Sequence, residues 1–260
     1  MEDEKKAPLF SVRGLKKVFH GSIGADFVNA LDGIDLDLIE GECTLIAGPN
    51  GSGKTMLMRI LAGLVEQTEG EVFFKGKLAD SSKDFLRRSV GLMFQDADAQ
   101  ILGETVEEDI RFGPENLKLP KEEIDARLEE VLSALSLSEK RDYPARRLSG
   151  GEKRRLVAAG VLAMGCETII MDEPFANLDF PGVSQVLKII SDLKQNGKTV
   201  IILTHELEKV LAFADRLVIL AQGKIRDSGN PEQVLDRLDP AWGVRDPRRS
   251  YKNAEDCTWL

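Results

Sequence analysis

A glycine-rich segment in the first quarter of the chain has the residue types needed to hold phosphate groups. It reads GPNGSGKT, from Gly48 to Thr55, and follows the apolar run Cys43–Ala47. Glycines let backbone amides curl around phosphate oxygens, and a helix start points its positive end at an anion. Lys54 can reach the outer phosphates, and the Thr55 hydroxyl can bind Mg²⁺. The alternative is a chance match on an ordinary turn. The expected nucleotide ligands are Gly48, Pro49, Asn50, Gly51, Ser52, Gly53, Lys54 and Thr55.

Two carboxylates follow another apolar run. Asp172 and Glu173 come directly after Thr168–Met171. Ligands of open α/β sheets bind beyond the carboxyl ends of the strands, so both acids are expected at the mouth of the phosphate site. Asp172 suits the Mg²⁺ shell, and Glu173 is free to orient or activate a water. The alternative for any such pair is a solvated acidic turn.

Two more polar residues also end apolar runs. Gln95 follows Val90–Phe94, and His205 follows Val200–Leu203 and one threonine. Each taken alone could be a structural or surface residue. Because four predicted strands end at side chains capable of chemistry, we expect Gln95 and His205 at the same edge of the sheet as the two acids. Both are therefore catalytic candidates, and Gln95 is also a candidate Mg²⁺ ligand.

A second candidate anion site lies in LSGGE, from Leu148 to Glu152. Ser149 and Glu152 form a capping-box pattern, so one interpretation is simply a well-capped helix that runs to about Met164. The functional interpretation is an anion site made of a serine hydroxyl and glycine amides at a helix N-terminus. Its expected ligands are Ser149, Gly150 and Gly151. The cations that follow are expected to form a solvated basic patch: Lys153, Arg154 and Arg155.

The elements that must position these residues alternate along the chain. The apolar runs named above, together with Leu217–Leu220, are predicted to be buried strands, with helices between them at 56–64 and 183–194. This order favours an α/β fold with a largely parallel sheet. Ile34–Leu38 alternates, as a half-exposed strand does. Between 97 and 164 no strand is convincing, and Lys121–Leu135 carries a helical apolar stripe.

These patterns predict an α/β core interrupted by a helical subdomain. The core is expected at 1–95 and 165–235, and the helical subdomain at 96–164. The remaining 236–260 form a C-terminal tail, whose polar stretch from Asp239 onward is expected to be loosely attached.

Composition limits the partners. The 260 residues carry a formal net charge of −9 at pH 7, which makes nucleic acid a poor partner. The three cysteines, Cys43, Cys166 and Cys257, are far apart in sequence, as is typical of a reducing cytoplasm. The charged start MEDEKKAPLF lacks the apolar core of a signal peptide, and the apolar runs are too short to span a bilayer. If the protein acts at a membrane, it would therefore need a partner protein there.

The motifs, taken in order, resemble those of the ABC ATPases over roughly Phe10 to Leu235. GPNGSGKT resembles Walker A, LSGGE the signature motif, and IIMDEP Walker B, with Glu173 at the catalytic glutamate. Gln95 is similar to the Q-loop glutamine and THE to the switch-histidine motif around His205.

Two further positions carry the resemblance. ANLD, from Ala176 to Asp179, resembles the D-loop. Phe19 falls where these proteins often stack an aromatic ring on adenine, although an ordinary edge-strand or core phenylalanine is the alternative.

The resemblance implies a P-loop (RecA-like) ABC nucleotide-binding core with an inserted helical subdomain. It implies ATP and Mg²⁺ as cofactors, and ATP hydrolysis coupled to transmembrane transport. It also implies a head-to-tail dimer of the chain with itself or with a paralogous ATPase subunit, in which Ser149 to Gly151 face the other copy's nucleotide. Asp179 is also expected to bind nucleotide. An integral membrane coupling protein would hold the dimer at the cytoplasmic face of the cell membrane, as a peripheral subunit.

A narrower resemblance follows Gln95. FQDADAQILGETVEEDIRFGPENL, from Phe94 to Leu117, is similar to the ATPases of energy-coupling-factor importers and their cobalt- and nickel-type relatives, which take up metal ions or vitamins. That family typically has an Asn-Pro pair where this chain has Asp96 and Ala97. The alternative is the cassette of another ABC transporter class, such as an exporter. Ile101 and Leu102 are expected either in the core or in a groove for the membrane partner.

Overall fold

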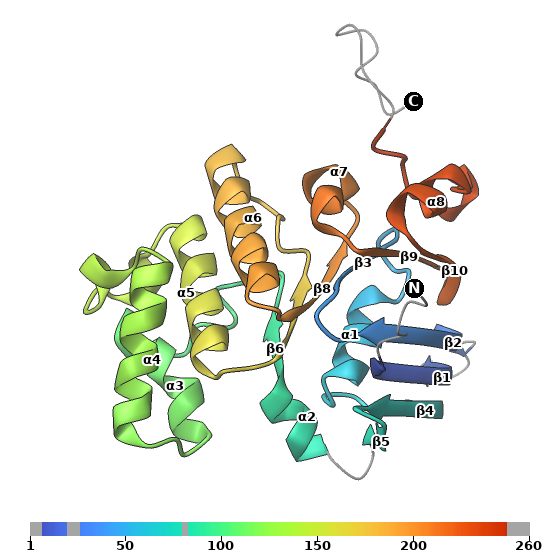
Figure 1. Ribbon diagram of the computed structural model, residues 1–260. Coiled ribbons are helices and arrows are strands. Elements are labelled where there is room, and N and C mark those ends of the chain that lie inside the picture. The colour runs from blue at the N-terminus through green and yellow to red at the C-terminus, as the bar shows by residue number, and fades with distance from the viewer. Residues whose placement is uncertain (1–6, 20–26, 80–82, 249–260) are drawn as a thin grey trace, which may run out of the picture.

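Two β-sheets with helices packed against them make up residues 7–19, 27–79 and 83–248, which this computed structural model describes (Figure 1). The larger sheet has the order β10-β9-β3-β8-β7-β6. All its strands run parallel except β10. Their bounds are β3 (Cys43–Ala47), β6 (Val90–Met93), β7 (Thr168–Asp172), β8 (Thr199–Thr204), β9 (Arg216–Ala221) and β10 (Lys224–Gly229).

The central strands are apolar along their whole length because both faces of the larger sheet are covered. In β8, Val200 and Ile202 belong to one core, while Ile201 and Leu203 belong to the other. A strand buried on both faces needs a continuous apolar run rather than alternation. The five predicted buried strands are confirmed, and their ends differ from the prediction by at most one residue.

A smaller antiparallel sheet has the order β2-β1-β4-β5. Its strands are β1 (Pro8–Phe19), β2 (Val28–Ile39), β4 (Glu69–Phe74) and β5 (Lys77–Leu78). The predicted alternation in β2 is confirmed, since Ile34, Leu36 and Leu38 are buried and Asp35 is exposed. Helix α1 (Lys54–Leu61) joins this sheet to the larger one, because Leu57 packs in the core shared by their strands.

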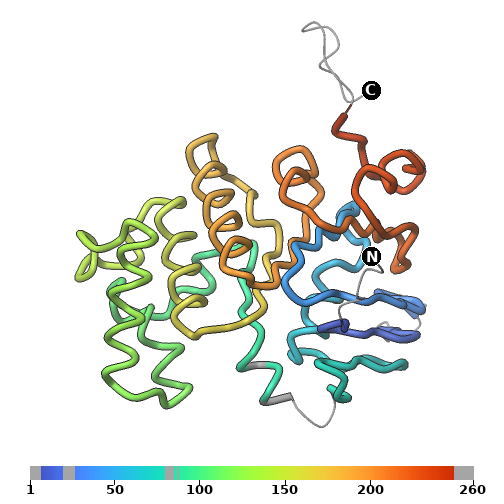
Figure 2. Tube along the Cα trace, viewed as in Figure 1, coloured from blue at the N-terminus to red at the C-terminus, as the bar shows by residue number. Residues whose placement is uncertain are grey.

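The predicted helical stretch is confirmed between residues 97 and 164, all of which the structure describes. It holds α3 (Val106–Asn116), α4 (Lys121–Ala134) and α5 (Gly150–Ala163), with short 3₁₀ turns at Ser138–Lys140 and Ala145–Arg147. The apolar stripe of α4 faces inward, as expected. Figure 2 shows this stretch at one end of the molecule, away from the smaller sheet.

The remaining helices flank the sheets. They are α2 (Lys83–Ser89), α6 (Phe180–Gln195), α7 (Leu207–Val210) and α8 (Pro231–Asp236), with 3₁₀ turns at Leu211–Phe213 and Pro240–Trp242. None of the helices in the described part of the chain is long and apolar enough to cross a membrane.

The expectation of a loose tail from Asp239 is wrong as far as Arg248. Val244 is buried and Trp242 packs against the larger core, so two apolar residues anchor an otherwise polar stretch. Arg248 closes the segment through ion pairs with Asp236 and Asp246. The rest of the predicted tail, including Cys257, lies outside the described residues.

Candidate functional site

The phosphate loop occupies a space that only glycine fits at two positions. A Cβ added at Gly48 would lie 2.0 Å from the carbonyl oxygen of Leu220, and one added at Gly53 would lie 2.6 Å from that of Ala30. Gly53 also has φ +108°, a conformation that side chains rarely adopt. The glycine spacing therefore reflects close packing of the loop against β9 and β2.

Lys54 opens helix α1 and turns back over the loop. Its Nζ donates to the carbonyl oxygens of Gly48 (2.7 Å) and Pro49 (3.2 Å), and lies 3.6 Å from Glu173 Oε1. The residue is only 6% exposed. Burial lowers the pKa of Lys54, and the charge of Glu173 opposes this shift. The ammonium thus joins the loop to an acid that lies far away in sequence.

Asp172 ends strand β7 beside the loop. Thr55 Oγ1 donates to Asp172 Oδ2 at 2.8 Å. Burial raises the pKa of Asp172, and the hydrogen bond from Thr55 opposes the rise. Asp172 Oδ1 and the hydroxyl of Ser52 are both buried without a hydrogen-bond partner. Oxygen atoms left free in this way, beside a lysine and a threonine, fit a site for Mg²⁺ and phosphate.

Glu173 is held in place by the neighbouring strand β8. Its backbone is left-handed, with φ 47°, and its N–H donates to the Leu203 carbonyl at 2.8 Å. This conformation strains a residue with a Cβ by about 1–2 kcal/mol. Thr204 Oγ1 donates to Oε2 at 3.0 Å, and His205 Nδ1 lies 3.0 Å from Oε1. The structure thus brings together the predicted Glu173 and His205, and adds Thr204, which the sequence analysis missed.

Gln95 lies at the same edge. Strands β6 and β7 pair in parallel with Met93 opposite Met171, so two residues further on Gln95 and Glu173 leave adjacent strands. Gln95 is exposed, and its carbonyl accepts a hydrogen bond from Arg154 at 3.2 Å. The shared edge predicted for all four strand ends is therefore present in the fold.

The LSGGE segment forms the predicted capping box. Ser149 Oγ accepts from the Glu152 amide at 3.4 Å, and Glu152 Oε2 accepts from the Ser149 amide at 2.9 Å. The hydrogen bond from Lys140 is the main reason that the pKa of Glu152 is lowered to about 2. Ser149 and Gly150 are exposed, and a Cβ at Gly150 would meet nothing within 4 Å. The surface in front of this helix start is open.

The two predicted anion sites lie at the starts of different helices, α1 and α5. Among the described residues, no hydrogen bond links 149–151 to the loop at 48–55. Asp179 also acts on its own helix, since its Oδ1 accepts from the Gly182 amide at 2.9 Å and caps α6. Asp179 is exposed.

Phe19 ends strand β1 with 43% of its surface exposed. It pairs with Val28 of β2, two residues before Ala30, whose carbonyl borders Gly53. Lys17 Nζ lies 5.3 Å from the ring centroid. The ring is therefore an open aromatic surface on the strand beside the one that borders the phosphate loop.

The expected basic patch after LSGGE is wrong. Arg154 is only 7% exposed, and the side chains of Lys153 and Arg155 are also largely covered. Arg154 donates to the carbonyl oxygens of Gln95 and Ala176, while Lys153 forms an ion pair with Asp98. Three consecutive positively charged residues would be expected to lie in solvent. In the structure their side chains point between packed segments instead.

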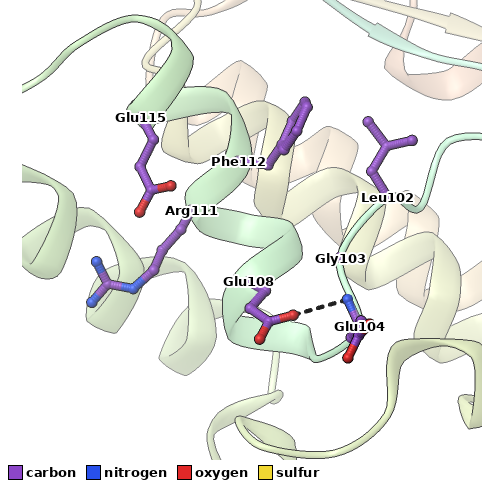
Figure 3. A pocket seen from close by; sticks show the side chains of 7 residues that line it. All are labelled: Leu102, Gly103, Glu104, Glu108, Arg111, Phe112 and Glu115. Carbon is purple, nitrogen blue, oxygen red and sulfur yellow. Dashed lines mark hydrogen bonds between the residues drawn. The ribbon is translucent and has the colours of Figure 1, made fainter.

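A cavity of about 390 Å³ lies along α3 and the loop that precedes it (Figure 3). Leu102 is 63% exposed and Phe112 is 48% exposed, and both side chains border it. Ile101, by contrast, is half-buried and packs against the larger core, so its assignment to a groove is wrong. The lining residues are Leu102, Gly103, Glu104, Glu108, Arg111, Phe112 and Glu115.

A phosphate loop between a strand and a helix, with acids at the end of a neighbouring parallel strand, defines a P-loop nucleotide-binding protein. The sequence profile described as ABC transporter matches residues 31–176. The energy-coupling factor transporter ATP-binding protein EcfA of Methanocaldococcus jannaschii is 42% identical over 217 residues, which cover 82% of this chain and 78% of that protein. The chain therefore belongs to the ABC transporter family.

Solved structures agree with this membership. CbiO1 of Clostridium perfringens, described as part of the ABC transporter complex CbiONQ, matches with a TM-score of 0.78 and 34% identity over 88% of this chain and 91% of that one. A dimeric ATP-binding cassette in a post-hydrolysis state, bound to ADP and Pi, matches with a TM-score of 0.75 and 27% identity over 85% and 98%. The expected ABC fold and ATPase class are confirmed.

These comparisons also bear on the subclass and setting. The relatives carry energy-coupling-factor and Cbi names, which favours the importer interpretation over the exporter alternative. Membership of a transporter family implies a membrane-associated subunit with a membrane partner. The matched ATP-binding cassette in the post-hydrolysis state is a dimer.

Proposed function

We propose that this chain binds MgATP and hydrolyses it to drive uptake of a metal ion or vitamin by an importer of the energy-coupling-factor type. It would work as a peripheral subunit at the cytoplasmic face of the cell membrane. The contact of Glu173 with both Lys54 and His205 carries the proposal. It brings a phosphate-binding cation from the start of α1 together with a carboxylate and a histidine from the ends of β7 and β8.

The phosphate loop would bind the nucleotide by exchanging partners. Lys54 Nζ now bonds to two loop carbonyls, and phosphate oxygens offer it stronger charge-assisted bonds. Thr55, Asp172 and Gln95 would hold Mg²⁺, which neutralises charge on the phosphates. The exposed ring of Phe19 would stack on the adenine.

Glu173 would act on the attacking water. A carboxylate can orient a water and accept its proton, and Thr204 and His205 fix the carboxylate for that task. The strained backbone of Glu173 is consistent with such a role, because strained residues concentrate at active sites. His205 would stabilise charge next to the terminal phosphate.

The second anion site would serve a partner subunit. Ser149, Gly150 and Gly151 present an open helix start that their own chain does not use for nucleotide. In a head-to-tail dimer, with itself or with a paralogue, they would cover the other copy's terminal phosphate. Asp179 is itself exposed at the start of α6 and would face the partner as well.

Glu173→Gln tests the catalytic assignment. The amide keeps the shape but cannot accept a proton, so MgATP binding should persist while steady-state ATP hydrolysis falls by about a hundred-fold or more. Glu167→Gln is the matched control, because Glu167 pairs with Lys75 on the surface. Near-normal turnover in Glu173→Gln would overturn the role of this residue.

We further propose that the cavity at α3 receives a helix of the membrane coupling protein. Leu102 and Phe112 offer apolar anchors, and Glu104, Glu108 and Glu115 surround them with carboxylates. The cavity's lone cation, Arg111, is already paired with Glu107 and Asp125. The site therefore fits a short helix that presents apolar and basic side chains.

Replacement of both Leu102 and Phe112 by glutamate tests this docking site. Both side chains are exposed, so the variant should fold and retain basal ATPase activity. Copurification with the membrane partner should be lost. Leu64→Glu, at another exposed apolar residue, is the control that should still assemble. Normal assembly of the double variant would refute the docking assignment without affecting the ATPase proposal.

A further inference from the structure

Arg154 links three segments through one guanidinium group. It lies in the second turn of α5, and its Nη2 donates to the carbonyl oxygen of Ala176 at 2.6 Å and to that of Gln95 at 3.2 Å. Gln95 leaves strand β6, and Ala176 lies three residues beyond Glu173. The helix that begins with the LSGGE glycines is thereby tied to both loops that leave the sheet at the nucleotide edge.

The surroundings of Arg154 are unusual for a cation. It is 7% exposed, and no carboxylate among the described residues lies within 4.0 Å of it. Burial lowers the pKa of its guanidinium, and the more distant Asp96 opposes the shift. An arginine nevertheless stays charged in proteins. Its charge is therefore matched chiefly by the two backbone carbonyls, which binds them more tightly than neutral donors would.

The two residues that flank Arg154 in α5 contact different segments of the chain. Lys153 forms an ion pair with Asp98, three residues beyond Gln95. Arg155 instead donates to the carbonyl of Leu135, at the end of α4. Lys153 and Arg154 therefore contact the loop that follows β6, whereas Arg155 contacts the end of α4.

We propose that Arg154 is a positioning residue that makes α5, the Gln95 loop and the loop after Glu173 move as one body. When Gln95 shifts toward bound nucleotide, the start of α5 would follow, carrying Ser149 to Gly151 to the face presented to the partner subunit. The Arg154 guanidinium would also make the loop that contains Ala176, and with it Asp179, move together with α5. This inference rests on the proposed function and adds the coupling residue to it.

Arg154→Met tests the coupling, since methionine fills similar space and donates nothing. In the full chain, MgATP should bind with a dissociation constant within about two-fold of the parent, because the phosphate loop is untouched. The kcat for ATP hydrolysis should fall by about ten-fold, as expected for loss of a charge-assisted hydrogen bond. ATP-driven dimerisation in the Glu173→Gln background should weaken by a similar factor.

Arg155→Met is the matched control, because it removes the next arginine on the same helix without touching either loop. It should leave kcat and dimerisation near the parent values. Equal loss in both variants would show a general effect on the helix and overturn the coupling role, as would an unchanged kcat in Arg154→Met. If the methionine variant does not fold, Arg154→Gln replaces it, since its shorter side chain reaches at most one carbonyl. An unchanged kcat in that variant would also overturn the inference.

The double variant with Gln95→Ala separates this inference from the proposed function. If Arg154 acts through Gln95, the two losses in kcat should be far from additive. Fully additive losses would overturn the coupling. If Gln95→Ala alone has no effect, the proposed role of Gln95 fails. In that case the ATP-driven dimerisation of Arg154→Met tests the link between Arg154 and the LSGGE helix. A dimer as tight as the parent's would overturn this link.

Discussion

Removal of the Lys54 ammonium should have two separate effects, one on the fold and one on nucleotide binding. Lys54→Met keeps most of the apolar stem and deletes the charge. The ammonium satisfies the carbonyls of Gly48 and Pro49 and lies 3.6 Å from Glu173. The Lys54 and Glu173 side chains are 6% and 8% exposed, so the variant leaves a buried carboxylate without its cation.

The size of each effect follows from these contacts. Breaking a buried ion pair by removing one partner costs about 3 kcal/mol or more, which for a chain of this size lowers Tm by roughly 6–12 °C. Loss of a charge-assisted hydrogen bond to phosphate costs about 1.5–3 kcal/mol, so the MgATP dissociation constant should rise by roughly 10–150-fold. Most of the lost stability should return in the Glu173→Gln background, because that change removes the unpaired charge.

Calorimetry of MgATP binding and thermal unfolding of the nucleotide-free protein measure the two effects. Lys198→Met is the control, since Lys198 donates to a single carbonyl, that of Cys166, outside the site. An unchanged dissociation constant would remove Lys54 from the phosphate site. If Lys54→Met lowered Tm by the same amount with glutamate and with glutamine at position 173, the energetic coupling of Lys54 and Glu173 would be refuted.

Three further changes probe other parts of the molecule. Ser149→Arg should leave MgATP binding to each monomer intact but block the ATP-driven dimer, as size-exclusion chromatography of a hydrolysis-deficient form would show. A dimer as tight as the parent's would contradict the in-trans role. Glu152, whose pKa is lowered to about 2 chiefly by the hydrogen bond from a lysine, contributes stability above pH 4.5 that is lost as pH falls toward 2. Urea unfolding should therefore show Glu152→Gln less stable at pH 6 by about 1–2 kcal/mol, with the difference vanishing near pH 2; a constant difference would exclude this linkage. Gly243→Ala should lower Tm more than Gly197→Ala, because both have similar positive φ but only the first would place a Cβ 3.2 Å from Pro49; equal effects would show that this contact is unimportant.

The positions of the strands and of the phosphate loop were predictable because they depend on local patterns. A strand covered on both faces needs a continuous apolar run, and Thr199–Thr204 supplies one. The loop needs contiguous glycines, a lysine and a helix start, all within Gly48 to Thr55. The alignment of Glu173 and His205 could be inferred as well, since both end parallel strands.

Burial of individual polar side chains was less predictable. The residues next to Arg154 in sequence are charged, as they would be around a cation in solvent. Arg154 is buried only because α5 packs against the loops that contain Gln95 and Ala176. Ile101 and Leu102 are adjacent and alike in type, yet one packs in the core and the other borders a cavity with Phe112. No periodicity distinguishes them, because the chain between β6 and α3 is irregular.

The sequence by itself determined the chemistry of this protein: a phosphate loop, acids and polar residues at strand ends, and a capped LSGGE helix. These depend on residue type and short spacing, which one segment carries alone. Only the tertiary structure decided which charged groups form pairs and which side chains are buried together. It paired Lys54 with Glu173, enclosed Arg154, and packed Trp242 and Val244 onto the core. Such contacts join segments far apart in the chain, so they depend on how the elements pack rather than on any local pattern.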